Sequence, residues 1–85
     1  MSSIRDILVD LGYENICDHG KEYRMRPIYR ESSNNTSLQV NKKNGYFTDY
    51  SANIKGSLTD LIKRTLKVGF HKAKKWISQK NINLE

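Results

Sequence analysis

The residues of this chain best suited to chemistry are aromatic rings and cationic side chains gathered around one predicted hairpin turn. Lys42 and Lys43 come just before the turn, and Tyr46 and Tyr50 follow it. Aromatic rings can stack on unpaired bases, and cationic groups can neutralise phosphates, so this mixture is typical of a surface for single-stranded nucleic acid. Eight side chains are candidates for that surface: Arg24, Arg26, Arg30, Lys42, Lys43, Tyr46, Tyr50 and Lys55.

Two alternatives stay open for these candidates. Neighbouring side chains of a strand point to opposite faces of a sheet, so one of Tyr46 and Phe47 belongs to the core and the other faces outward. A second basic group follows further along the chain, and it either contacts phosphates or is an ordinary solvated helix face. This group consists of Lys63, Arg64, Lys67, Lys72, Lys74 and Lys75.

Catalysis and metal binding find little support in the sequence. His19 and His71 are far apart, and neither has a Cys, Ser or Asp arranged around it in a recognisable motif. Cys17 is the single cysteine, so no internal disulfide can form, and we expect a buried or idle thiol. A phosphate-binding Gly-rich loop, a zincin motif, a nucleophile elbow and paired carboxylates are also lacking. We therefore expect a protein that is not an enzyme and needs neither metal nor cofactor.

The charge of the chain is positive and unevenly distributed. The net charge is +6, with six basic and six acidic residues in 1–42 but nine basic and three acidic residues in 43–85. Such a surplus favours an anionic partner, because Lys and Arg that neutralise phosphates release condensed counterions, although solubility alone also explains it. Neither a signal peptide nor a run of about 18 apolar residues is found, so we expect a cytoplasmic protein without membrane contact.

The candidate residues must be positioned by a small set of helices and strands. Ile4, Ile7, Leu8 and Leu11 have helical spacing and predict a helix over 3–11, with Ser3 as N-cap and Gly12 as its end. Strands are predicted over 21–28, 36–41 and 46–50, and Asn44-Gly45 predicts a type I′ hairpin turn with positive φ at both residues.

Two further helices are predicted after the strands. The first begins at Ser57, with Asp60 as capping-box partner, and ends at Gly69. The second begins near Phe70 or His71 and carries one apolar stripe, namely Phe70, Ala73, Trp76 and Ile77. The sequence thus predicts an α+β fold with a three-stranded antiparallel sheet, one N-terminal helix and two C-terminal helices. We expect one domain over 1–82, with 83–85 as a tail or cloning scar.

Four segments carry a further pattern across these elements. They are Arg26-Pro27-Ile28-Tyr29-Arg30-Glu31, Thr36-Ser37-Leu38-Gln39-Val40-Asn41, Gly45-Tyr46-Phe47-Thr48-Asp49-Tyr50 and Lys55-Gly56-Ser57-Leu58-Thr59-Asp60-Leu61-Ile62. In order and spacing they resemble the motifs of the N-terminal zinc-ribbon domain of DnaG-type DNA primases, apart from a short insertion near Ser33. The resemblance covers almost the whole chain and implies a small zinc-ribbon-like fold.

The chain departs from this family at every zinc ligand. The ligand positions fall on Arg26, Tyr29, Asp49 and Ala52, and none of these residues is a Cys or His, so zinc is not expected. Structural zinc contributes on the order of 10 kcal/mol of folding free energy in small domains, so another interaction must replace it. We expect a charge-assisted hydrogen bond between Arg26 and Asp49, with Tyr29 covering the former metal cavity.

The resemblance also implies a function. In the family this domain engages single-stranded template DNA next to a catalytic domain that starts a primer. The chain is therefore predicted to be a metal-free DNA-binding module of a primase or other replication protein, with a primase catalytic domain or a helicase as partner. Variants without the metal look like those of phage and mobile-element relatives. The alternative is a small phage or mobile-element protein that binds and inhibits a host replication or defence nucleoprotein complex.

Overall fold

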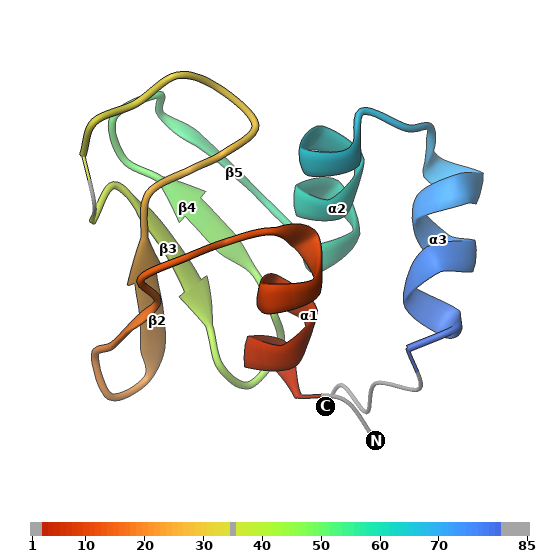
Figure 1. Cartoon of the computed structure of the whole chain (residues 1–85), viewed down its shortest axis with the longest axis horizontal. Helices are drawn as coiled ribbons and strands as arrows, with labels where there is room; N and C mark the ends of the chain where they lie inside the picture. Colours follow the sequence, from red (N-terminus) through yellow and green to blue (C-terminus); the bar gives the residue numbers. More distant parts are fainter. Residues whose placement is uncertain (1–2, 35, 81–85) are drawn as a thin grey trace.

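The fold is α+β, with one N-terminal helix, a five-stranded antiparallel sheet and two C-terminal helices (Figure 1). The computed structural model describes residues 3–34 and 36–80. The elements are α1 (Ile4–Leu11), β1 (Cys17–Asp18), β2 (Glu22–Met25), β3 (Leu38–Asn41), β4 (Phe47–Asp49), β5 (Ile54–Gly56), α2 (Leu58–Leu66) and α3 (Phe70–Ser78). Within the described residues, no helix is long and apolar enough to cross a membrane. The tail predicted at 83–85 lies outside the described residues.

The prediction of a three-stranded sheet is wrong, because the sheet has five strands in the order β1-β2-β3-β4-β5. The three predicted strands are its centre, and each is shorter than predicted. The two additional strands are the edges, and they are too short to show an alternating pattern, since β1 has two residues and β5 has three. β2 ends at Met25 instead of Ile28, near the buried Pro27, which has no N–H group to donate to a ladder.

The helix starts are confirmed, but one helix end is not. At α1, Ser3 and Asp6 exchange hydrogen bonds in a capping box, and Gly12 ends the helix with a φ of 104°. At α2, the Ser57 side chain accepts a hydrogen bond from the Asp60 N–H group. The predicted end of this helix at Gly69 is wrong: Lys67 ends it with a φ of 57°, and Gly69 is the N-cap of α3.

The hairpin between β3 and β4 is confirmed, but its turn is not type I′. Asn41 and Tyr46 enclose four residues, and the Asn41 N–H group donates to the Tyr46 carbonyl at 2.8 Å. Gly45 has a φ of 76°, whereas Asn44 does not have a positive φ. The Asn41 side chain explains this difference, because its Oδ1 atom accepts hydrogen bonds from the N–H groups of Lys43 and Asn44 and so stabilises a wider turn.

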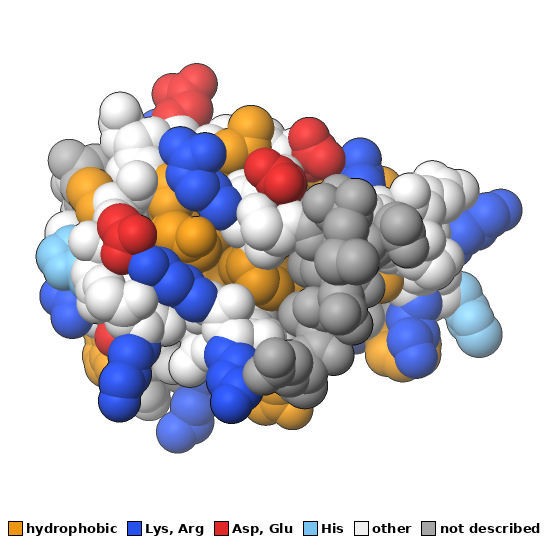
Figure 2. All heavy atoms as spheres, turned by 90° about the horizontal axis from the view of Figure 1, so that it is seen from below, with side chains coloured by type: hydrophobic (Ala, Val, Ile, Leu, Met, Phe, Trp, Pro, Cys, Tyr) orange, Lys and Arg blue, Asp and Glu red, His pale blue; other side chains and the backbone are white. Residues whose placement is uncertain are grey.

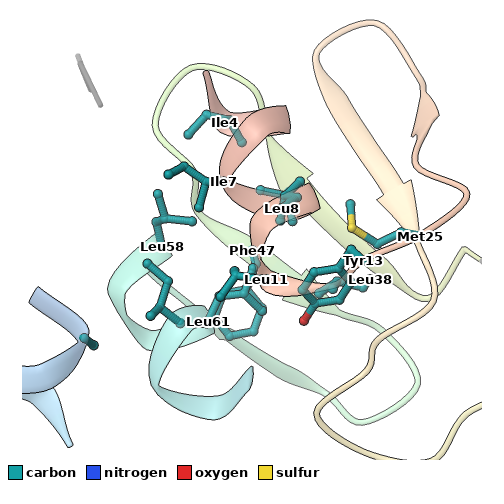
Figure 3. Close-up of a cluster of buried hydrophobic side chains, with 13 residues drawn as sticks. Ile4, Ile7, Leu8, Leu11, Tyr13, Met25, Leu38, Phe47, Leu58 and Leu61 are labelled. Carbon is teal, nitrogen blue, oxygen red and sulfur yellow. The ribbon is translucent and has the colours of Figure 1, made fainter. Parts of the chain in front are cut away.

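The core lies between the sheet and the first two helices (Figure 3). It includes Ile7, Leu8 and Leu11 from α1, Met25, Leu38, Val40 and Phe47 from the sheet, and Leu58, Leu61 and Ile62 from α2. α3 packs on α2 through the buried Ala73, with Trp76 and Ile77 partly buried. Phe70 was expected in this stripe but is 51% exposed, so that part of the prediction is wrong.

Two glycines give a matched test of how the hairpin packs on α2. Gly45 and Gly20 have similar φ values of 76° and 79°, so an alanine is strained at both positions by about 1–2 kcal/mol. A Cβ atom at Gly45 would lie 2.8 Å from Leu58 Cβ, whereas nothing lies within 4 Å of one at Gly20. We expect Gly45→Ala to lower the free energy of unfolding by about 1–3 kcal/mol more than Gly20→Ala in urea titrations. Equal losses would contradict this packing.

Candidate nucleic-acid interface

One face of the sheet is left uncovered by the helices. Because side chains alternate along each strand, the residues between the buried core positions point away from α1 and α2. The strand register aligns Arg24 with Gln39, Gln39 with Thr48 and Thr48 with Lys55 across four strands. We call this the open sheet face, and it is formed by Glu22, Arg24, Gln39, Asn41, Tyr46, Thr48, Tyr50 and Lys55.

Two exposed aromatic side chains stand on the open sheet face. Tyr46 is 60% exposed and Tyr50 is 63% exposed, and they lie two residues before and after Thr48. A shallow groove of about 230 Å³ runs between them, lined by Glu22, Gln39, Asn41, Tyr46, Thr48 and Tyr50. Four residues of extended chain span about 13 Å, so the two rings are far enough apart to contact different bases.

Two polar atoms beside this groove have no hydrogen-bond partner among the described residues. Arg24 Nε lies 3.5 Å from Glu22 Oε2, and both atoms are buried without a hydrogen-bond partner among the described residues. The positive charge of Arg24 is thus partly compensated by Glu22. The groove combines hydrogen-bonding groups of both kinds with aromatic rings, and it carries little net charge.

The structure brings four of the eight predicted site residues together on the open sheet face, namely Arg24, Tyr46, Tyr50 and Lys55. Of the two adjacent aromatics, Tyr46 faces outward and Phe47 is in the core. Sequence reasoning missed Gln39, Asn41 and Thr48, although the alternation of Leu38 and Val40 with polar residues could have indicated them.

The other four candidates lie elsewhere. Lys42 makes an ion pair with Asp18, and its Nζ atom lies 4.9 Å from the centre of the Tyr23 ring. Lys43 is exposed in the hairpin turn. Arg26 is exposed beyond the end of β2 and lines a hollow of about 450 Å³ next to Gly12. The remaining candidate, Arg30, belongs to a partly buried cluster around Asp49 and is described below.

Asp49 is the buried centre of this partly buried cluster. Its side chain is fully buried and accepts two hydrogen bonds from Arg30, one from Nε at 2.8 Å and one from a terminal guanidinium nitrogen at 2.7 Å. The Tyr29 hydroxyl donates to the same carboxylate at 2.5 Å, and the Ala52 N–H group donates at 3.3 Å. We call Tyr29, Arg30, Asp49 and Ala52 the Asp49 cluster.

The expected ion pair between Arg26 and Asp49 is therefore wrong, because Arg30 and not Arg26 contacts Asp49. Arg26 is exposed, whereas the chain after the buried Pro27 brings Tyr29 and Arg30 to Asp49. No feature of the sequence distinguishes the two arginines. Three of the four positions that the family resemblance assigns to zinc ligands, those of Tyr29, Asp49 and Ala52, meet in this cluster.

The electrostatics of the cluster keep Asp49 charged. Burial alone would raise the pKa of this carboxyl group, but the hydrogen bonds from Arg30 and Tyr29 outweigh it and lower the pKa. Burial and the adjacent Asp49 raise the pKa of Tyr29 well above its usual range. The pKa of Tyr13, whose hydroxyl lies 2.9 Å from Thr65 Oγ1, is raised by burial to about 12. Asp49 is therefore ionised and both tyrosines are neutral near pH 7.

The described residues contain no group of three or more His, Cys, Asp or Glu side chains that could hold a metal ion. Cys17 is exposed, so of the two expected alternatives, a buried or an idle thiol, the buried one is wrong. Comparison with protein families, with curated proteins and with solved structures finds no match for this chain.

Proposed function

We propose that this chain is a metal-free, zinc-ribbon-like module that binds single-stranded template DNA through the open sheet face. The observation that carries this proposal is the pair of exposed rings, Tyr46 and Tyr50, on the same uncovered face as Arg24 and Lys55. The module would act in DNA replication, as part of a primase or as a partner of a primase catalytic domain or helicase.

Stacking explains why such a face would select single strands. Every unpaired base offers a planar surface, and stacking on an aromatic side chain contributes about 1–3 kcal/mol per base. The bases of a duplex are already stacked and paired, so they are not available to Tyr46 and Tyr50. The polar groups of the groove, from Gln39, Asn41 and Thr48, could then hydrogen-bond to base edges or phosphates.

The Asp49 cluster supports the zinc-ribbon-like part of the proposal. A metal that joins the loop before β3 to the end of β4 would be replaced by a carboxylate that joins the same two segments through Tyr29 and Arg30. A buried ion pair with several hydrogen bonds can hold two segments in one arrangement without a metal. The proposed role is binding and not catalysis, because the cluster has its hydrogen bonds directed within the protein.

A titration of labelled DNA tests the proposal. Fluorescein-labelled oligothymidine and a duplex of the same length would be titrated with the chain at low and at physiological salt, with fluorescence anisotropy as the readout. We expect the single strand to bind more tightly at physiological salt, and both affinities to fall as salt rises. Absence of single-strand binding at both salt concentrations would contradict the proposal and favour a protein that binds and inhibits a host nucleoprotein complex.

A further inference from the structure

The positive charge of the chain is concentrated in its last two helices. Residues 61–80 contain seven Lys or Arg and no Asp or Glu, whereas the other 65 residues contain eight basic and nine acidic side chains. The open sheet face lies in the part that is close to neutral. The electrostatic attraction of this chain for an anion must therefore come mainly from α2, α3 and the loop between them.

Most of these cations have no acidic partner in the part of the chain that the structure describes. Lys63 lies 3.9 Å from Asp60, and Lys80 lies 3.2 Å from Asp10. The remaining Lys and Arg side chains of residues 61–80 form no salt bridge with a described residue. We call the following set the helical basic surface: Lys63, Arg64, Lys67, Lys72, Lys74 and Lys75. In Figure 2, basic side chains project from the right-hand end, where α3 lies, and among the coloured residues no acidic side chain is visible there.

An exposed aromatic ring lies within this surface. Phe70 is 51% exposed, and its ring centre lies 6.0 Å from Lys63 Nζ and 5.3 Å from Lys74 Nζ. Lysines from two helices thus converge on one ring. Lys74 forms no salt bridge with a described residue, and the Lys63 pair with Asp60 is long and exposed, so both charges can interact with an external anion.

The helical basic surface and the open sheet face point away from each other. α2 lies on the covered side of the sheet, and α3 lies on the far side of α2 (Figure 1). One segment of nucleic acid could therefore occupy the open sheet face while another occupies the helices.

We infer that the helical basic surface is a second nucleic-acid-binding surface, which takes the phosphate backbone of duplex DNA. Phosphate contacts need no unpaired bases. The closely spaced negative phosphates of a duplex are complementary in charge to a surface of cationic side chains. An interface with another protein is less compatible, since lysine is depleted in the cores of such interfaces. A membrane is less compatible too, because the large apolar side chains exposed on the described parts of α2 and α3 are Leu66 and Phe70 alone.

The test compares two variants with the same net charge. Lys72→Ala/Lys75→Ala removes two exposed lysines of α3, and Arg5→Ala/Lys21→Ala removes two exposed cations, one in α1 and one just before β2. Duplex DNA would be titrated with each chain over a range of salt concentrations. We expect the α3 variant to bind duplex about tenfold more weakly at low salt. We also expect its slope of log affinity against log salt to be smaller by about 2, since each phosphate contact contributes about 0.9. The control should keep the slope of the parent chain.

Several outcomes would overturn the inference. Equal losses of duplex affinity in both variants would mean that only the net charge of the chain matters. Absence of duplex binding by the parent chain would mean that the helical basic surface does not bind duplex DNA. The open sheet face is tested separately, because unpaired bases are needed there. Single-strand binding without duplex binding would contradict the second surface alone, and duplex binding without single-strand preference would contradict the proposed function alone. Equal melting temperatures by circular dichroism would establish that all variants are folded.

Discussion

Asp49→Ala is expected to remove a large part of the stability of the protein. The substitution leaves the Arg30 guanidinium and the Tyr29 hydroxyl without the carboxylate that now accepts three of their hydrogen bonds. Breaking a buried ion pair by removing one partner costs about 3–5 kcal/mol. Asp49 is fully buried but the Arg30 side chain is 27% exposed, so we expect a loss near the lower end of this range, which is still a large part of the about 5–15 kcal/mol that stabilises a typical domain. Thermal unfolding by circular dichroism measures it.

Two other variants make this prediction specific. Asp18 also pairs with a cation, Lys42, but its side chain is 66% exposed, so Asp18→Ala should cost far less stability than Asp49→Ala. Tyr29→Phe removes one hydrogen bond to a charged group and should cost about 1.5–3 kcal/mol. A melting temperature of Asp49→Ala close to that of Asp18→Ala would contradict a stabilising role for the Asp49 cluster.

The same cluster makes stability depend on pH with a definite sign. The pKa of Asp49 is lower in the folded chain than its usual value of about 4, so its contribution is complete above that value and is lost as pH falls. The pKa values of Tyr13 and Tyr29 are raised, so their contribution is complete below the usual tyrosine value of about 10 and is lost as pH rises. The parent chain should therefore be most stable between about pH 5 and 9.

Tyr46→Ala/Tyr50→Ala is expected to weaken binding of single-stranded DNA about a hundredfold or more. Each stacked base contributes about 1–3 kcal/mol, and two rings are removed. Both side chains are more than half exposed, so the fold should persist. Anisotropy titration with oligothymidine measures the effect, and duplex binding through the helices should remain.

A conservative pair of substitutions is the control for this result. Tyr46→Phe/Tyr50→Phe keeps both rings and removes only their hydroxyl groups, so it should bind single strands within a few-fold of the parent chain if stacking dominates. Equal weakening by the Phe and Ala variants would mean that hydrogen bonds, and not stacking, hold the strand. Unchanged binding by the Ala variant would exclude the open sheet face as the site.

The predictable parts of the fold are those with strong local patterns. Helical spacing and the N-cap residues Ser3 and Ser57 predicted where two helices begin. The alternation of apolar and polar residues predicted the three central strands. The edge strands, β1 and β5, form because their neighbours β2 and β4 offer them unpaired backbone groups, and a sequence of two or three residues carries no pattern for this. Tertiary context also decided the end of α2 at Lys67, where the chain turns two residues before Gly69.

Only four of the eight predicted site residues lie on the open sheet face, and the reason is similar. Tyr46 and Tyr50 share a face because they flank β4 at an even spacing, and this could be deduced from the sequence. Whether Arg26 or Arg30 reaches Asp49 depends on the path of an irregular segment after Pro27, which no periodicity describes. Lys42 was assigned to the interface because it adjoins the turn, but it pairs with Asp18 from β1, a strand that the sequence did not predict.

The measurement that tests the central proposal most directly is a nuclear magnetic resonance titration of the isotope-labelled chain with oligothymidine at physiological salt. We predict that the ring resonances of Tyr46 and Tyr50 shift, together with the amide resonances of Gln39 and Thr48 between them on the open sheet face. Shifts confined to α2 and α3, or no shifts at all, would contradict binding of single-stranded DNA by the sheet.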